Sequence, residues 1–168
     1  MQTEILFEEV QAFAAKSVQQ VVHLLTIFLA FGSLLSLFIT SLQQKEITAS
    51  LLLGALFSGI VNFALSKAKL ITQVHTDGIY VRFPPLQTGY TICRWDDIDT
   101  LFIRTYNPLI EFGGWGIRFG PNGRAYNTYG TTGLQIHFKN GGKLLIGTQQ
   151  PDALRKALEQ VSRYDYFH

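Results

Sequence analysis

Two apolar stretches decide the fold of this chain: residues 21–40, VVHLLTIFLAFGSLLSLFIT, and residues 47–66, ITASLLLGALFSGIVNFALS. Neither stretch contains a charged side chain. A helix of about 20 residues, at about 1.5 Å rise per residue, reaches about 30 Å, the thickness of the hydrocarbon core of a bilayer. Two such helices in succession are difficult to enclose in a chain of 168 residues. The sequence therefore predicts a transmembrane helical hairpin with spans of about 19–42 and 47–66.

The connection between the two spans is only the segment 43–46, QQKE. A connection so short makes the helices antiparallel neighbours, so both ends of the hairpin lie on one side of the membrane. Three basic side chains flank the hairpin on that side, against Lys45 in the connection: Lys16, Lys67 and Lys69. Because basic residues prefer the cytoplasmic side, we expect both termini in the cytoplasm.

Charge divides the chain into two parts. Residues 1–69 carry four basic and four acidic side chains, whereas residues 70–168 carry ten basic and eight acidic ones. The second part therefore has the composition of a soluble domain. The segment before the first span, ILFEEVQAFAAK (5–16), is expected to form a short amphipathic helix at the membrane interface. Its apolar side would consist of Leu6, Val10 and Phe13.

Small and polar residues recur every four positions in the second span: Ser50, Gly54, Ser58, Asn62 and Ser66. The first span has the same spacing at Gly32, Ser36 and Thr40. Such residues allow helices to pack closely in lipid. The two stripes either face each other within the hairpin or contact another copy or another membrane protein. Within the hairpin we expect a hydrogen bond between Asn62 and Thr26, and we expect His23 to reach the headgroup region.

After residue 69 the apolar pattern changes from helical to alternating. Eight segments rich in β-branched and aromatic residues are separated by turn signals: LITQVH (70–75), GIYVRF (78–83), GYTICRW (89–95), IDTLFIRTY (98–106), WGIRF (115–119), RAYNTY (124–129), GLQIHF (133–138) and KLLIG (143–147). Seven or eight short strands predict a small antiparallel barrel or sandwich. A closing helix over about 151–163 is predicted from an apolar stripe that must cover an open end of the sheets: Leu154, Ala157, Leu158 and Val161.

The run from Leu70 to Leu158 resembles the bacterial pleckstrin-homology-like domains. The similarity rests on the Asp77-Gly78 hairpin, on Trp95-Asp96-Asp97-Ile98, and on the final KLLIGTQQPDAL. The two spans together with FGGWGIR (112–118), AYNTYG (125–130) and LLIGTQ (144–149) resemble a group of uncharacterised bacterial membrane proteins. The resemblance implies an α+β protein of the bacterial inner (plasma) membrane, in which the transmembrane hairpin precedes a bent antiparallel β-barrel of about seven strands with a C-terminal capping helix. It implies no particular ligand. The inositol phosphate site of the wider fold is not expected, because its loop, residues 75–78, has no Lys or Arg here.

The most unusual local sequence of the second part is Gly113-Gly114-Trp115-Gly116. Glycines permit positive φ, and Trp115 offers a large aromatic face with one donor. A candidate surface for a peptide or an anion combines it with four other side chains: Arg104, Arg118, Arg124 and Tyr126. Alternatively, Trp115 packs inward as a local plug or dips into the lipid interface. Of these, we expect the buried plug.

The sequence carries no recognisable catalytic motif. It lacks a Gly-x-Ser-x-Gly elbow and a His-Glu-x-x-His pair, and its only cysteine, Cys93, lies in a strand-like segment typical of a core. His75-x-Asp77 at a hairpin tip is expected to be structural. A net charge of +2 gives no argument for nucleic acid. We therefore expect no catalytic residue, no metal and no cofactor.

The leading hypothesis is a non-enzymatic, membrane-anchored binding or scaffolding module that binds another protein or helps to assemble a membrane complex. Its expected partners are the lipid bilayer and, through the small-residue stripes, a second copy or a membrane protein. The alternative is a module that binds lipid headgroups or small anions at the membrane surface. A membrane-bound enzyme is a third, more distant hypothesis.

Overall fold

The computed structural model describes residues 4–13, 16–39 and 45–162, except for the side chains of residues 16–19, 36–39, 45–48 and 162. The chain separates into two compact units. The helical unit is Ala14–Lys67, and the β unit combines Met1–Phe13 with Ala68–His168. Gln43 and Gln44 of the predicted connection, and Thr40, lie outside the described residues, and α2 begins at Lys45. The predicted α+β class is confirmed.

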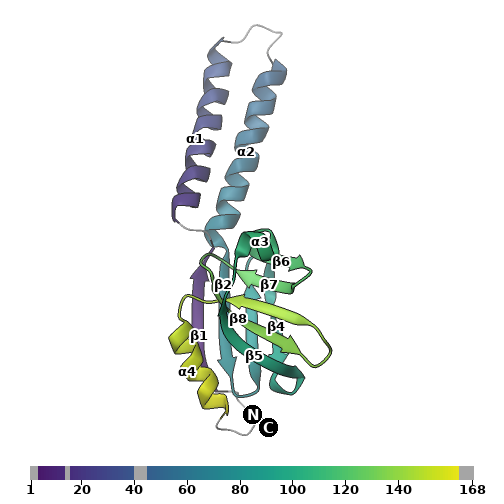
Figure 1. The fold of residues 1–168 in the computed structure, drawn as a ribbon. Coiled ribbons are helices and arrows are strands. Elements are labelled where there is room, and N and C mark those ends of the chain that lie inside the picture. Colours follow the sequence, from purple (N-terminus) through teal and green to yellow (C-terminus); the bar gives the residue numbers. More distant parts are fainter. Residues whose placement is uncertain (1–3, 14–15, 40–44, 163–168) are drawn as a thin grey trace. The chain divides into compact units, whose positions relative to one another are not determined.

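The β unit contains two sheets (Figure 1). The first has the order β1-β2-β3-β4, built from β1 (Ile5–Ala12), β2 (Lys69–His75), β3 (Gly78–Phe83) and β4 (Gln87–Arg94). The second has the order β5-β8-β9-β7-β6, built from β5 (Ile98–Thr105), β6 (Gly116–Gly120), β7 (Gly123–Asn127), β8 (Thr132–Phe138) and β9 (Lys143–Gly147). All eight strands predicted after residue 69 are confirmed, and β3 and β9 have the predicted bounds.

The predicted antiparallel barrel of about seven strands is wrong in closure and in strand direction. The described residues form nine strands in two open sheets. Within the second sheet β7 and β9 run parallel, with Arg124–Tyr126 beside Leu144–Ile146. This arises because β9 folds back on β8 as a hairpin, and its other edge then receives β7. Alternating hydrophobicity shows which side chains face a core, but it does not show which strands become neighbours.

The N-terminal segment is a strand and not the expected amphipathic helix. β1 runs antiparallel to β2, with Val10 opposite Ile71. Its burial alternates, so that Phe7, Glu9 and Gln11 are buried. The helical interpretation failed because two of these three inward side chains are polar. In addition, the partner strand follows only after both apolar helices.

Helix α4 (Pro151–Ser162) confirms the predicted C-terminal stripe. All four stripe residues are buried: Leu154, Ala157, Leu158 and Val161. They share one core with residues of both sheets, including Leu70 and Phe83 of the first sheet and Leu134 of the second. Burying one such side chain contributes about 1.5–3 kcal/mol, so α4 is an integral part of the β unit.

The helical unit consists of α1 (Lys16–Ile39) and α2 (Lys45–Lys67), which lie antiparallel (Figure 1). Large apolar side chains cover its outside, with Phe28, Phe57 and Phe63 exposed by 73%, 70% and 67%. Within the described residues, Ala49–Lys67 is the one helical segment long and apolar enough to cross a membrane. The apolar segment of α1, Gln20–Leu35, is shorter than such a span.

Candidate interaction surfaces

Polar side chains of the helical unit meet between α1 and α2. Thr26 Oγ1 and Ser58 Oγ lie 2.8 Å apart, and Asn62 Nδ2 lies 2.8 Å from His23 Nδ1. The expected bond between Asn62 and Thr26 is therefore wrong, because Asn62 instead reaches His23, nearly one turn before Thr26 on α1. His23 correspondingly contacts the partner helix. These contacts satisfy polar groups on the inside of the helix pair.

The small-residue stripe of α2 contacts α1 along part of its length. Ser58 and Asn62 are 8% and 7% exposed. At Gly54 an added Cβ would lie 3.9 Å from Leu29 Cδ1, which is ordinary van der Waals contact. Ser50 is exposed. The packing side of α2 therefore includes Gly54, Ser58 and Asn62.

Gly32 of the predicted α1 stripe does not lie in the contact with α2. An added Cβ at Gly32 would meet no atom within 4 Å. Its neighbour Ser33 is only 2% exposed and donates a hydrogen bond to the carbonyl of Leu29 at 2.7 Å. The side chain of Ser36 lies outside the described residues. A face that includes Thr26 and Ser33 thus replaces the Gly32 face in the contact with α2.

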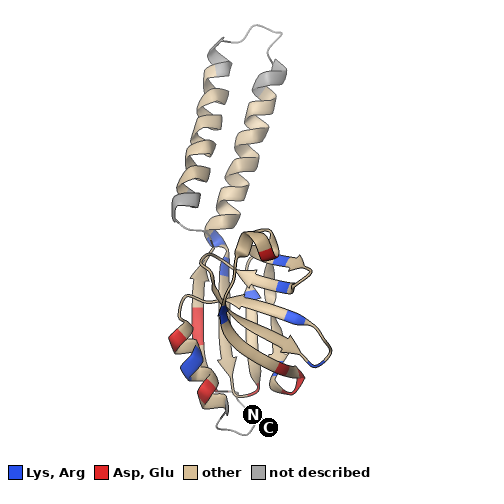
Figure 2. Ribbon diagram, in the orientation of Figure 1, with Lys and Arg blue, Asp and Glu red and all other residues tan. Residues whose placement is uncertain are grey.

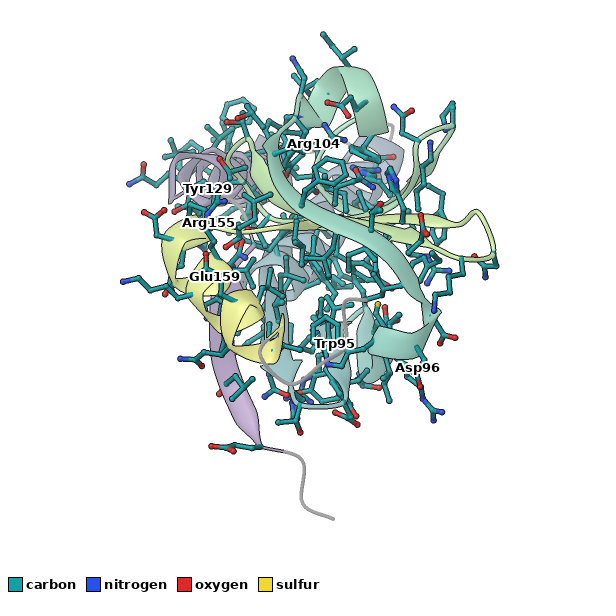
Figure 3. All side chains as sticks on the ribbon, turned by 60° about the horizontal axis from the view of Figure 1, so that its bottom comes forward. Trp95, Asp96, Arg104, Tyr129, Arg155 and Glu159 are labelled. Atoms are coloured by element: carbon teal, nitrogen blue, oxygen red, sulfur yellow. The ribbon has the colours of Figure 1, made fainter. Side chains whose placement is uncertain are left out.

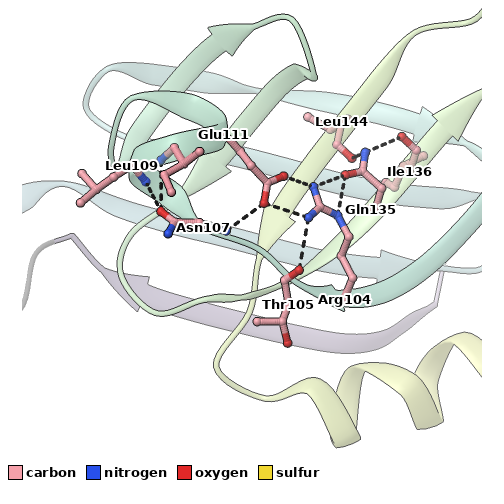
Figure 4. Close-up of polar contacts among 9 residues, drawn as sticks. Arg104, Thr105, Asn107, Leu109, Glu111, Gln135, Ile136 and Leu144 are labelled. Atoms are coloured by element: carbon pink, nitrogen blue, oxygen red, sulfur yellow. Dashed lines mark hydrogen bonds and ion pairs between the residues drawn. The ribbon is translucent and has the colours of Figure 1, made fainter.

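Arg104 of β5 holds helix α3 (Pro108–Phe112) to the second sheet (Figure 4). Its guanidinium pairs with the Glu111 carboxylate at 2.6 Å and also donates to Gln135 Oε1 and to the carbonyl of Thr105. The hydrogen bonds from Arg104 lower the pKa of Glu111, helped by the backbone N–H of Asn107. All these partners are internal, so Arg104 is a structural residue in this conformation.

Arg118 and Arg124 lie on the β6–β7 hairpin but point to opposite faces of it. The register places Arg124 opposite Phe119, the neighbour of Arg118, and adjacent residues of a strand alternate in direction. Tyr126 is only 1% exposed, and its hydroxyl donates to Gln87 Oε1 at 2.8 Å. Tyr126 therefore belongs to the interior and not to the predicted binding surface. The structure does not gather the three candidate arginines around one hollow.

Trp115 lies in the glycine-rich turn between α3 and β6. Three residues of this turn have positive φ, with angles of 69°, 126° and 111° at Gly113, Gly114 and Gly116. The peptide after Trp115 is fixed, because the N–H of Gly116 donates to Asn127 Oδ1 at 2.9 Å. Trp115 itself is 37% exposed, so the expected buried plug is wrong. Arg118 Nε donates to the carbonyl of Trp115 at 2.8 Å, which places a guanidinium beside the indole residue.

A buried polar network, which the sequence did not indicate, joins β1 to the connection between β9 and α4. The Glu9 carboxylate accepts hydrogen bonds from Thr148 Oγ1 at 2.7 Å and from the N–H of Gln149 at 2.8 Å. Gln11 Nε2 donates to the carbonyl of Gly147 at 2.7 Å. Glu9 and Gln11 are 2% and 3% exposed. The LLIGTQ segment thus anchors the N-terminal strand, and the only signal for it was a pair of polar residues at alternate positions in β1.

The main open feature of the β unit is the edge of β5. Among the described residues, β5 pairs only with β8, so its other edge carries no strand. A groove of about 520 Å³ lies between this edge and α4. It is lined by Asp99, Thr100, Leu101, Phe102, Ile103, Arg155, Leu158 and Glu159. Figure 3 shows Arg155 and Glu159 on α4, with Trp95 and Arg104 towards opposite ends of β5.

The groove has an apolar floor and a charged rim. Leu101 and Ile103 are partly buried and pack against the main core, and Leu158 is 8% exposed. Charges of both signs stand on the rim, from β5 and from α4. An open backbone edge, an apolar floor and a charged rim are the elements that bind an extended peptide.

Within the described residues, no group of three or more His, Cys, Asp and Glu side chains could hold a metal ion. Cys93 is 2% exposed, and burial raises the pKa of its thiol to about 12. Because the thiolate is the nucleophilic form, Cys93 is inert at neutral pH. The features that stand out in the described residues are surfaces for recognition.

Comparisons with protein-family models, with curated proteins and with solved structures found no match for this chain. Function is therefore inferred from the geometry of each unit.

Proposed function

We propose that this protein is a membrane-anchored interaction module, in which the α1–α2 hairpin crosses the membrane and the β unit binds another protein. The anchor is supported by the inverted arrangement of the helical unit. Its phenylalanines are exposed, whereas Ser58 and Asn62 are buried. Exposed apolar surface costs about 25 cal/mol per Å² in water, and this cost disappears in lipid. Small polar residues that bond to one another are typical of contacts between membrane helices.

The orientation proposed for the hairpin places both termini in the cytoplasm of a bacterial cell. It is supported by Lys16, Lys67 and Lys69 on the terminal side against Lys45 in the connection. A phosphatase that is active only outside the cytoplasm, fused to the C-terminus, should remain inactive. A fluorescent protein that folds in the cytoplasm should be bright at the same position. An active phosphatase fusion would contradict this orientation.

The observation that carries the binding function is the free edge of β5 above the α4 groove. Unpaired backbone groups on an edge strand accept a further strand, and neighbouring pockets select its side chains. The partner is therefore an extended segment of another protein, with an apolar side chain that enters between Leu101 and Leu158.

A displayed library of random peptides, selected against the full chain in nanodiscs, tests this function. Thr100→Lys places a charge on the open edge of β5, a device by which natural edge strands avoid pairing. This variant should bind the selected peptides at least about tenfold more weakly than the wild type, which corresponds to about 1.4 kcal/mol. The matched control is Thr88→Lys, an equally exposed threonine on the edge strand β4, which should leave binding unchanged.

A second pair of variants tests the α4 side of the groove. Arg155 lines the groove, whereas its exposed neighbour Lys156 does not. Arg155→Glu should change the selected sequences or weaken their binding, and Lys156→Glu should not. Amide exchange of β5 should slow when a peptide binds. Selected peptides that bind equally to the wild type, Thr100→Lys and Arg155→Glu would contradict the proposal.

A discrete pocket for a small anion has less support. Arg104 is paired with Glu111, and Arg118 and Arg124 point to opposite faces of their hairpin.

A further inference from the structure

The chain leaves the β unit for the helices, and returns from them, at one end of the β unit. The N–H of Phe13 donates to the carbonyl of Ala68 at 2.9 Å, so the exit and the return lie side by side. The N–H of Lys69 donates to the carbonyl of Pro84, and an added Cβ at Gly116 would lie 3.8 Å from the Phe13 ring. Figure 1 shows α3 and β6 at this same end, where β1 ends and β2 begins.

This end carries the most exposed large apolar side chains of the described β unit. Ile110, Leu86, Phe119 and Leu109 are exposed by 84%, 71%, 69% and 62%, and Trp115 by 37%. They come from three neighbouring segments: the β3–β4 loop, α3 with its glycine turn, and β6. An added Cβ at Gly120 would lie 3.5 Å from the carbonyl of Glu111, which joins the end of β6 to α3. We name these five residues the junction surface.

Basic side chains accompany the junction surface. Arg118 donates to the carbonyl of Trp115, the Arg124 guanidinium lies 4.9 Å from the centre of the Phe119 ring, and Lys69 is exposed at the chain return. The turns at the opposite end, between β2 and β3 and between β4 and β5, hold three acidic residues (Figure 2): Asp77, Asp96 and Asp97. That end also holds Tyr80, Arg94 and Trp95, so the junction end is distinguished by its strongly exposed apolar side chains and not by aromatic or basic groups alone.

We propose that the junction surface docks onto the headgroup region of an anionic phospholipid bilayer, the membrane that holds the helical unit. This inference rests on the proposed membrane anchor. Ala68 is joined by one peptide bond to Lys67, the last residue of the apolar segment that is long enough to cross a membrane. Covalent connection therefore keeps this end close to lipid at a high effective concentration. Tryptophan favours the membrane interface, and guanidinium groups pair with phosphates.

A lipid surface fits this end better than a protein partner. Separate apolar side chains, of which Trp115 and Phe119 lie beside an arginine, suit the interface, where rings and aliphatic chains enter the acyl boundary and guanidinium groups reach phosphate. The β5 groove, by contrast, has a continuous floor and a free backbone edge. The two surfaces therefore serve different partners, and docking of the junction surface would hold the β unit against the bilayer.

The two tryptophans of the chain provide the experiment. Trp95 is 5% exposed, lies in the β4–β5 turn at the opposite end, and donates through Nε1 to the carbonyl of His75. The full chain is reconstituted in nanodiscs of phosphatidylcholine with phosphatidylglycerol, with and without bromine-labelled acyl chains. In Trp95→Phe, the emission of Trp115 should shift to the blue and lose most of its intensity on brominated lipid. In Trp115→Phe, the emission of Trp95 should be unaffected.

Charge and apolar variants sharpen the result. Arg118→Gln and Arg124→Gln should each lower the equilibrium constant for docking about fivefold on anionic lipid, and less on phosphatidylcholine alone. Ile110→Asn should reduce the quenching of Trp115, whereas Ile92→Asn, an exposed position on β4, should not. Unquenched Trp115 in chains that are incorporated in nanodiscs would overturn the docking surface while leaving the anchor intact. Chains that fail to incorporate would overturn the anchor, and the docking surface with it.

Discussion

The helical unit and the β unit sort the same kinds of residue in opposite ways. In the helical unit Phe57 is 70% exposed, while Asn62 is 7% exposed and bonds to His23. In the β unit Phe83 is completely buried at 0%, whereas charged side chains such as Arg118 and Arg155 are exposed. The contrast follows if the first unit is solvated by lipid and the second by water. Under the proposed anchor, one chain meets two solvents, and each solvent decides which side chains are driven inside.

The largest expected effect comes from replacing a phenylalanine by alanine, once in each unit. Phe83→Ala should destabilise the β unit by about 3–5 kcal/mol, as large aromatic deletions in cores do. Phe57→Ala should change the stability of the helical unit by less than about 0.5 kcal/mol, because its ring contacts the same solvent in the packed and separated helices. Amide exchange of the full chain in nanodiscs, resolved by segment, measures both. A large effect of Phe57→Ala would mean that this face packs against protein.

The next test concerns the inside of the helical unit. Gly54→Leu should weaken the packing of α1 on α2 by about 1–3 kcal/mol, because the added side chain must displace Leu29, which already lies 3.9 Å from an added Cβ. Gly32→Leu is the matched control, since open space surrounds that position, and it should leave the pair unchanged. Unfolding in mixed detergents, followed by helicity, measures the difference. If Gly32→Leu instead changes the size of the complex, its face contacts a second copy.

A third test examines polar burial in the β unit. Gln11→Ala removes the amide that donates to the carbonyl of Gly147 and accepts from Thr128 Oγ1. Leaving these buried groups without a partner should cost about 1–3 kcal/mol. Gln73→Ala, on the neighbouring strand, loses an exposed bond to Glu8 and a partly buried one to His75, and should cost less, about 0.5–1 kcal/mol. Urea unfolding, monitored by Trp95 emission in a Trp115→Phe background, distinguishes the two. Equal losses of stability in the two variants would show that the buried bonds of Gln11 contribute no more than the bonds of Gln73.

Local patterns were sufficient to predict much of the fold. Alternation and turn residues located all eight strands after residue 69, and the stripe from Leu154 to Val161 located α4. These features depend on neighbours in sequence. The strand β1 was missed because its partner is distant in the chain and because Glu9 and Gln11 occupy its buried side. The parallel pairing of β7 with β9 was missed for the same reason, since it depends on which edges remain free.

The candidate sites show the same limit. The sequence named Trp115 as unusual, and its three glycines with positive φ do present it on the surface. The arginines could not be assigned from sequence, because their partners come from other elements: Glu111 on α3 binds Arg104, and the β6–β7 register separates Arg118 from Arg124. The β5 groove had no sequence signal. It exists only because α4 and an open edge meet in space.

The smallest expected effect comes from the ion pair between Arg104 and Glu111, which has no equivalent between the helices of the described helical unit. Hydrogen bonds from Arg104 lower the pKa of Glu111 from its ordinary value of 4.5 in the folded protein. A carboxyl group with a lowered folded pKa stabilises the fold above its unfolded pKa, and this contribution is lost as the pH falls through the folded pKa.

Glu111→Gln should therefore cost about 0.5–1 kcal/mol at neutral pH, the upper part of the range for partly exposed pairs. The difference between wild type and variant should shrink as the pH falls below 4.5, because the wild-type carboxyl then becomes protonated as well. Urea unfolding of the full chain in nanodiscs at a series of pH values measures this difference. A double variant, Arg104→Gln with Glu111→Gln, isolates the pairwise contribution from the loss of either partner alone. A difference that stays constant down to acidic pH would show that Glu111 supports α3 through its shape and its bond to the N–H of Asn107, and not through its charge.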